Sequence, residues 1–133
     1  MSGYWSLPVT ALTIALLLPA LKDGPTLNAA DRKADEDRAF FESKVRPVLE
    51  KNCLLCHGGA KVRNNLKLTS RRSLLEGGDH GPAIVPGDPD RSLMIRAVRY
   101  TGNFHMPPKG KLDDQHIADL VEWVKRGAPW PSP

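Results

Sequence analysis

The only two cysteines of this 133-residue chain stand in one pentapeptide, residues 53–57, which reads Cys-Leu-Leu-Cys-His. Three chemistries use two cysteines at this spacing. A redox disulfide is expected near alternating strands and helices, a pattern that this sequence lacks. A zinc site needs two further ligands, and only His80, His105 and His116 are available. Neither chemistry accounts for a histidine placed directly after the second cysteine.

Covalent haem attachment uses all three side chains of the pentapeptide. The thiols of Cys53 and Cys56 add to the two haem vinyl groups as thioethers, and one helical turn between them matches the spacing of those groups. The imidazole of His57 then reaches the iron from the same side. The pattern therefore predicts one covalently bound haem c, attached through Cys53 and Cys56 and with His57 as an iron ligand.

A methionine in a loop is the predicted second axial ligand. Met106 lies among glycines and prolines, where packing does not require a methionine, and Pro107 favours an extended conformation for it. A methionine opposite a histidine also raises the reduction potential relative to two nitrogen ligands. The competing candidates are His105 and Met94, and Met94 is explained by core packing next to Val98 at helical spacing.

The periodicity of apolar residues predicts three or four short helices. One helix is expected up to residue 52, with a restart at Pro47, and a second over residues 93–100. The last and best defined runs from its cap, Asp113, to a stop at Gly127. Because no strand-rich core is indicated, the predicted fold class is all-α.

The connections between these helices are expected to be irregular. No element is predicted between residues 61 and 72, where Leu66 and Leu68 alternate like a short extended segment, and residues 76–90 are expected to form a loop. With 12 prolines, 11 glycines and 6% aromatic residues, the core is thin, and a large apolar macrocycle would add the buried area that it lacks. The side chains expected to pack against one another and the porphyrin are Phe40 or Phe41, Leu120, Trp123 and Val124.

The N-terminal segment differs from the rest of the chain. Its apolar run, Leu7–Leu21, is shorter than the ~20 residues that a membrane-spanning helix needs and is typical of a secretory signal. We interpret residues 1–30 as a signal peptide or a retained N-terminal anchor, residues 31–39 as a polar lead-in and residues 40–131 as a monohaem domain. The protein is expected to be exported, to the periplasm or another extracytoplasmic compartment.

The chain carries a net charge of +4 and a basic stretch after the pentapeptide. Its members are Lys61, Arg63, Lys67, Arg71 and Arg72. Such a stretch is most often a solvated face, but it would also guide an acidic redox partner, and one arginine could pair with a haem propionate. Nucleic-acid binding is not indicated, because no recognition fold accompanies the charges.

Several stretches together carry a family resemblance. They are residues 40–49, the pentapeptide, Val85–Pro89 with Ser92-Leu93, Met106-Pro107-Pro108, and Trp123–Trp130. This combination resembles the planctomycete-type cytochrome c domain, a branch of class I cytochrome c. The resemblance implies a small all-α fold with one covalent haem, His57 proximal and Met106 distal. Similar domains often precede larger regions, so the chain is expected to be either a stand-alone carrier or the haem module of a larger multidomain protein.

Two functions compete for such a domain. An electron carrier fills both axial positions of the iron and transforms nothing. A haem enzyme, such as a peroxidase-like module, needs an open iron position and an acid/base residue above it, for which His105 or His80 would be the candidates. Met106 as the sixth ligand favours the carrier, and the chain is therefore expected not to be an enzyme.

Overall fold

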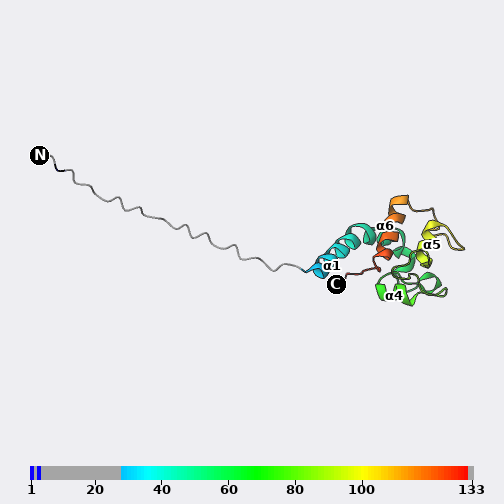
Figure 1. Ribbon diagram of the computed structural model, residues 1–133. Helices are drawn as coiled ribbons and strands as arrows, with labels where there is room; N and C mark the ends of the chain where they lie inside the picture. The colour runs from blue at the N-terminus through cyan, green and yellow to red at the C-terminus, as the bar shows by residue number, and fades with distance from the viewer. Residues whose placement is uncertain (2, 4–27, 132–133) are drawn as a thin grey trace.

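The computed structural model describes residues 1, 3 and 28–131 of the chain, and this part is built from helices and loops (Figure 1). The Leu7–Leu21 run lies outside the described residues. The elements are, in chain order, α1 (Ala29–Phe40), the π-helical turn η1 (Phe41–Val45), α2 (Arg46–Asn52), α3 (Leu54–His57), the 3-10 turn η2 (Arg63–Asn65), α4 (Arg71–Glu76), α5 (Leu93–Arg99) and α6 (Asp114–Lys125). Over residues 28–131 the one β-type pairing is an isolated bridge between Gly78 and Gly81, and the all-α prediction is confirmed.

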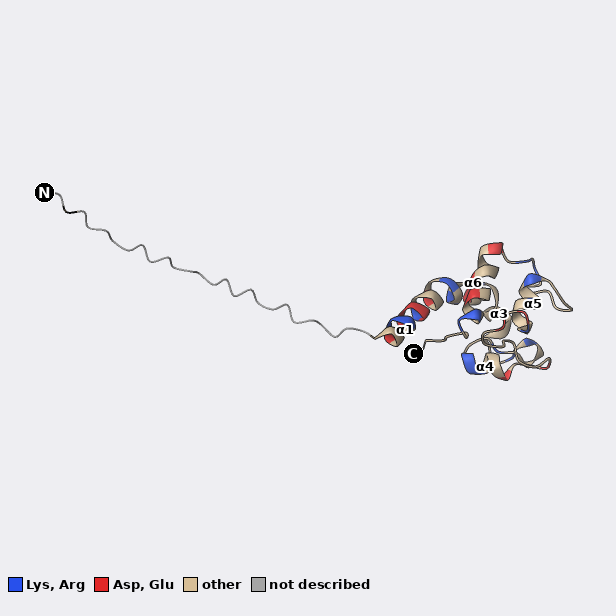
Figure 2. Ribbon diagram, in the orientation of Figure 1, with Lys and Arg blue, Asp and Glu red and all other residues tan. Residues whose placement is uncertain are grey.

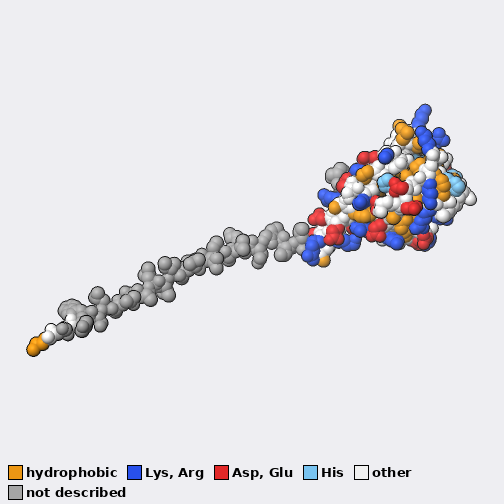
Figure 3. Space-filling view, turned by 90° about the horizontal axis from the view of Figure 1, so that it is seen from above, with side chains coloured by type: hydrophobic (Ala, Val, Ile, Leu, Met, Phe, Trp, Pro, Cys, Tyr) orange, Lys and Arg blue, Asp and Glu red, His pale blue; other side chains and the backbone are white. Residues whose placement is uncertain are grey.

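The polar lead-in is itself a helix. Asn28 caps α1 by accepting a hydrogen bond from the Asp31 N–H at 2.9 Å, so the predicted boundary after residue 30 falls in the first turn of this helix. Charges of both signs cover α1, which projects from the side of the domain (Figure 2). Both signs also mix over the face of the domain seen in Figure 3.

A wide helical turn joins α1 to α2. The new α-helix begins at Arg46, one residue before the restart predicted at Pro47. The Arg46 N–H bonds to the carbonyl of Phe41, five residues back, as in a π-helix. Since Pro47 has no N–H to donate to the preceding turn, a regular α-helix would lose a hydrogen bond here. The chain therefore stays helical through the proline but changes its winding.

The sequence did not reveal α4. The expectations of no element up to residue 72 and of a loop from residue 76 are wrong at Arg71, Arg72 and Glu76, which lie in this short helix. Ser70 and Ser73 build a reciprocal capping box at its start, each side chain bonding to the backbone N–H of the other. Six residues are too few to show a helical period, and the serine pair was the available signal.

The last two helices match their predictions closely. Asp113 caps α6 by accepting from the His116 N–H at 2.8 Å, and Gly127 follows its end with a φ of 91°. Ser92 occupies the cap position of α5, but its hydroxyl is buried and donates to the carbonyl of Asp88 at 2.8 Å instead of capping the helix. The described helices include none that is long and apolar enough to cross a membrane.

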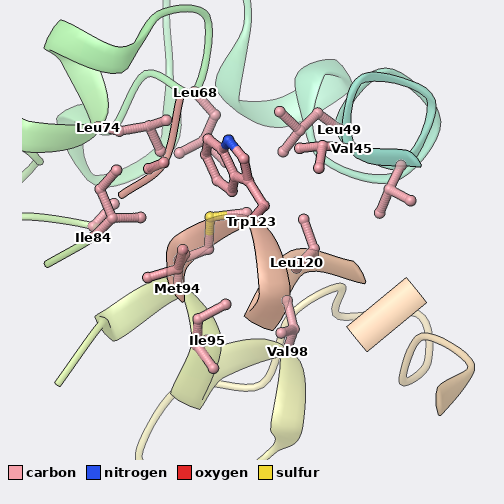
Figure 4. Close-up of a cluster of buried hydrophobic side chains, with 14 of the residues drawn as sticks. Val45, Leu49, Leu68, Leu74, Ile84, Met94, Ile95, Val98, Leu120 and Trp123 are labelled. Atoms are coloured by element: carbon pink, nitrogen blue, oxygen red, sulfur yellow. The ribbon is translucent and has the colours of Figure 1, made fainter. Parts of the chain in front are cut away.

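The core is centred on Trp123 of α6 (Figure 4). Its indole ring is fully buried, and its N–H donates to the carbonyl of Pro129 at 2.8 Å. Phe41 packs beside it, with ring centroids 6.0 Å apart, and Trp130 lies against Phe41 at 4.6 Å. Leu120 and Val124 belong to the same cluster, so the expected packing of these side chains against one another is confirmed.

Candidate haem site

A cavity of about 790 Å³ opens on the domain and brings together the four site residues predicted from the sequence. Cys53, Cys56, His57 and Met106 all line it. The remaining walls come from η2, the turn at residues 78–81, α5 and the loop that precedes α6. Its volume falls within the range of about 300–1,000 Å³ that is typical of pockets for small molecules and cofactors.

The pentapeptide forms a single helical turn. Cys53 ends α2 and precedes α3, and its carbonyl accepts the N–H groups of Cys56 at 3.2 Å and His57 at 3.0 Å. Burial raises the pKa of the Cys53 thiol to about 11, whereas Cys56 is exposed. A thiol that is neutral at physiological pH, or a thioether, places no charge in this half-buried position.

The ring of His57 is oriented by the backbone. The side chain is 7% exposed, and its Nδ1 lies 2.9 Å from the carbonyl oxygen of Leu66. Because a carbonyl only accepts, Nδ1 carries the proton, which leaves the lone pair of Nε2 for a metal. The Leu68 N–H returns a bond to the His57 carbonyl at 2.9 Å, so residues 66–68 run along this histidine as an extended strap.

The two methionines that line the cavity, Met94 and Met106, occupy different environments. Met94 is 7% exposed and belongs to the core cluster, although its side chain also reaches the cavity wall. Met106 is half-buried in the loop after α5, and its N–H donates to the carbonyl of Ala97 at 3.1 Å. The structure thus places Met106 on the cavity with its backbone tied to a helix.

The histidines outside the pentapeptide are dispersed. His105 is exposed and stacks on Tyr100, with ring centroids 4.6 Å apart and planes at 6°, and it does not line the cavity. His80 does line it, beside the ring of Phe104 at 4.6 Å, as does His116, which pairs with Asp113. Among residues 28–131 no three histidine, cysteine or acidic side chains gather as they would for a metal ion, so these histidines do not complete a zinc site with the two cysteines.

The large core side chains that are expected to pack against the porphyrin are not part of the cavity lining. Phe41, Leu120, Trp123 and Val124 pack behind the cavity and do not line it, and Phe40 is partly buried beneath the guanidinium of Arg126 at 4.3 Å. Apart from Phe104, the apolar wall is formed mainly by smaller residues. They are Leu66, Leu68, Ala83, Leu93, Ala97, Val98 and Leu112. Phe41, Trp123 and Trp130 pack against one another between η1, α6 and the segment that follows α6.

The residues of the basic stretch have different roles: some bond to other parts of the fold, and one lines the cavity. Arg71 donates to the carbonyls of Ala128 at 3.1 Å and Gly127 at 3.2 Å, and Arg72 pairs with Glu76 at 2.7 Å. Arg63 lines the cavity. Three lysines from other segments join it there, namely Lys51, Lys109 and Lys111. The cations at the cavity thus come from segments distant in sequence, and only Arg63 of the predicted stretch is among them.

The residues present fit a haem. Two thiols one helical turn apart, an imidazole with a free Nε2 and a thioether border one largely apolar cavity, and this donor set matches covalent attachment with axial ligation. The fold and this site define the class of the protein as a small all-α haem-binding cytochrome domain.

Comparison with known families identifies the domain further. Residues 53–110 match the family described as Planctomycete cytochrome C, and this match supports a planctomycete-type cytochrome c domain in that part of the chain. The matched range holds both cysteines of the chain and Met106, and it lies inside the domain predicted over residues 40–131. A cytochrome c family implies covalent haem. No curated protein and no solved structure was found to match the chain.

Proposed function

We propose that this domain is a one-electron carrier in which His57 and Met106 are the axial ligands of the iron. The observation that carries the proposal is that both side chains line the same cavity as Cys53 and Cys56. When bound, the haem supplies a couple between ferrous and ferric iron. With both axial positions filled by protein side chains, no position remains for a substrate, which favours a carrier over an enzyme.

Each residue contributes a distinct part of this function. Cys53 and Cys56 tether the cofactor, so that it is retained through oxidation and reduction. The Leu66 carbonyl fixes the tautomer of His57 and makes Nε2 a better donor. The thioether of Met106 and the apolar wall both favour the reduced state, because the thioether donates weakly and the wall excludes water.

The redox partner is proposed to be a protein with an acidic docking surface. Arg63, Lys51, Lys109 and Lys111 line the cavity, whereas Asp79 and Asp113 are the acidic residues there. Their excess of positive charge would guide an acidic surface toward the haem by long-range attraction. Contacts of this kind are small and transient. The rate of electron exchange should then fall as the salt concentration rises.

We also propose that the protein is exported and works in the periplasm or an equivalent compartment. The apolar run Leu7–Leu21 and the cytochrome c family support export. Fractionation of cells that produce the full chain, with haem staining of each fraction, tests this. Haem-stained protein confined to the cytoplasm would contradict the proposal, and haem-stained protein in the membrane fraction would indicate a retained anchor.

The axial ligation is tested by visible spectroscopy of the protein produced with haem-attachment machinery. The oxidised protein should show a low-spin spectrum with the weak red band that accompanies methionine–iron ligation. Met106→Ala should lose this band. Met94→Leu is the matched control, because it removes the other methionine of the cavity at similar volume and should keep the band.

The other outcomes separate the alternatives. If Met94→Leu loses the band and Met106→Ala keeps it, the axial ligand is Met94 and the proposed role of Met106 is wrong. A high-spin spectrum that is indifferent to Met106, together with peroxide turnover, would favour the enzyme and make His80 its acid/base candidate. A colourless protein would contradict haem binding altogether.

A further inference from the structure

The segment that carries Met106 has few contacts of its own. Most residues of the loop 101–110 are exposed, and Met106 itself is only half-buried. A thioether is a weak ligand, so its bond to iron depends on a loop that is already held near the bound conformation. The backbone bond from the Met106 N–H to the Ala97 carbonyl, 3.1 Å long, restrains one point of this loop.

Tyr100 contacts the residues on both sides of Met106. Its hydroxyl donates to the carbonyl of Pro107 at 2.5 Å, and its ring stacks on His105, with centroids 4.6 Å apart. The N–H of Tyr100 bonds to the Ala97 carbonyl, the same acceptor that Met106 uses. The Tyr100 side chain therefore contacts the residue before Met106 and the residue after it. The N–H groups of Tyr100 and Met106 also share one acceptor, the Ala97 carbonyl.

Tyr100 has an unusual backbone conformation, and this conformation directs its side chain toward the Met106 loop. It ends α5 in the left-handed region, with φ 62° and ψ 32°, which is unfavourable for a residue that has a Cβ. Glycine or asparagine would fill such a position with less strain. The conformation turns the ring from the end of α5 onto the Met106 loop, where the hydroxyl and the ring face are both used.

We infer that Tyr100 is the positioning residue for Met106, holding the loop so that the thioether stays at the haem. This inference rests on the ligation proposed above. Tyr100 does not itself line the cavity, and it acts through the carbonyl of Pro107 and the ring of His105. Without the hydroxyl, Met106 should leave the iron more often and an added ligand should replace it more readily.

The test compares three variants of the haem-loaded protein. Tyr100→Phe removes the hydroxyl and keeps the stacking ring, whereas Tyr100→Leu removes both. Thr101→Val is the matched control, because it removes a neighbouring hydroxyl that reaches a carbonyl of α5, that of Arg96 at 3.5 Å, without touching the residues beside Met106. The measurements are the methionine–iron band, the titration of the ferric protein with imidazole, and the exchange rate of the Met106 amide proton.

Tyr100→Phe should bind imidazole about tenfold more tightly than the unmodified protein, a difference of about 1.4 kcal/mol. Tyr100→Leu should bind it more tightly still and show a weaker band, and the Met106 amide should exchange faster in both. Thr101→Val should match the unmodified protein in all three measurements. A purely structural role would lower the unfolding temperature of the Tyr100 variants without changing the imidazole affinity, and that result would overturn the inference.

Two further outcomes are decisive in different ways. If Thr101→Val binds imidazole as tightly as Tyr100→Phe, the effect is a general loosening of the loop and the inference about Tyr100 fails. If the unmodified protein lacks the methionine–iron band, the proposed ligation fails instead. Amide exchange then still tests the contact between Tyr100 and the Met106 loop. An unchanged exchange rate of the Met106 amide proton in Tyr100→Leu would show that Tyr100 does not hold the loop.

Discussion

At the scale of single residues, the backbone rather than a side chain fixes the ring of His57. Its Nδ1–H is taken by the Leu66 carbonyl, and its own carbonyl accepts from Leu68. No side-chain substitution deletes a carbonyl, so this orientation tolerates changes along the strap as long as its extended course is kept. The proton on Nδ1 and the lone pair on Nε2 are therefore set by the course of residues 66–68.

The two cysteines are predicted to make independent bonds to the haem. Cys53→Ala and Cys56→Ala should each leave one thioether, so the haem should stay with the chain under denaturing conditions. The double variant should release the haem into acidified organic solvent, because only axial ligation and packing then hold it. Haem staining of a denaturing gel measures this directly. Release of the haem from either single variant would contradict two thioethers.

At the scale of elements, a glycine turn fastens one cavity wall to another. Gly78 and Gly81 bond to each other through their backbones, and the Asp79 N–H donates to the Asn64 carbonyl of η2 at 2.9 Å. A Cβ on Gly78 would lie 2.3 Å from that same carbonyl oxygen, closer than real atoms approach. The turn and η2 therefore pack backbone to backbone.

Gly78→Ala should consequently destabilise the haem-loaded protein. Backbone atoms cannot rotate away as a flexible side chain can, so the turn must move off η2, at a cost of about 1–3 kcal/mol in the free energy of unfolding. Gly59→Ala is the control, because its new Cβ would meet nothing closer than 4.0 Å. Denaturant unfolding followed at the haem absorbance measures both. Equal stability of the two variants would contradict the close approach seen at Gly78.

The sequence predicts a helix well when the helix is long and when its cap, apolar face and stop lie close together in the chain. α6 has an aspartate cap, an apolar face and a glycine stop within fifteen residues, and it was predicted almost to the residue. α4 has six residues and was missed, and α1 shows no apolar face that would separate it from a polar loop. Local chemistry also explains why Cys53, Cys56 and His57 could be named in advance.

The supporting contacts of the site could not be predicted, because the residues that make them are distant or use the backbone. The Leu66 carbonyl lies nine residues from His57, and a carbonyl has no signature in a sequence. The role of Arg71 was equally hidden, since its acceptors at Gly127 and Ala128 lie more than fifty residues away. Composition predicts a thin core, but it does not show whether a given aromatic side chain faces that core or the haem.

At the scale of the whole molecule, the domain is a small core beside a cavity of about 790 Å³. In the core, Trp123 and its neighbours pack α6 against η1. The cavity beside this core is lined mainly by loops and short helices. Leu66, Leu93 and Phe104 line the cavity and are only partly buried, so a bound haem would cover apolar surface that they expose. Part of the apolar surface of the folded domain is therefore buried only when the cofactor is in place.

Removal of the haem should accordingly cost the domain its fixed tertiary packing. We expect the chain produced without haem-attachment machinery to keep part of its helix content, to lose its near-ultraviolet circular dichroism and to bind a hydrophobic dye. The haem-loaded protein, with Trp123 held rigidly in its core, should instead unfold in one cooperative transition. Circular dichroism of the two forms during heating makes the comparison. A haem-free chain that melts cooperatively at the same temperature would show that the side-chain core alone supports the fold.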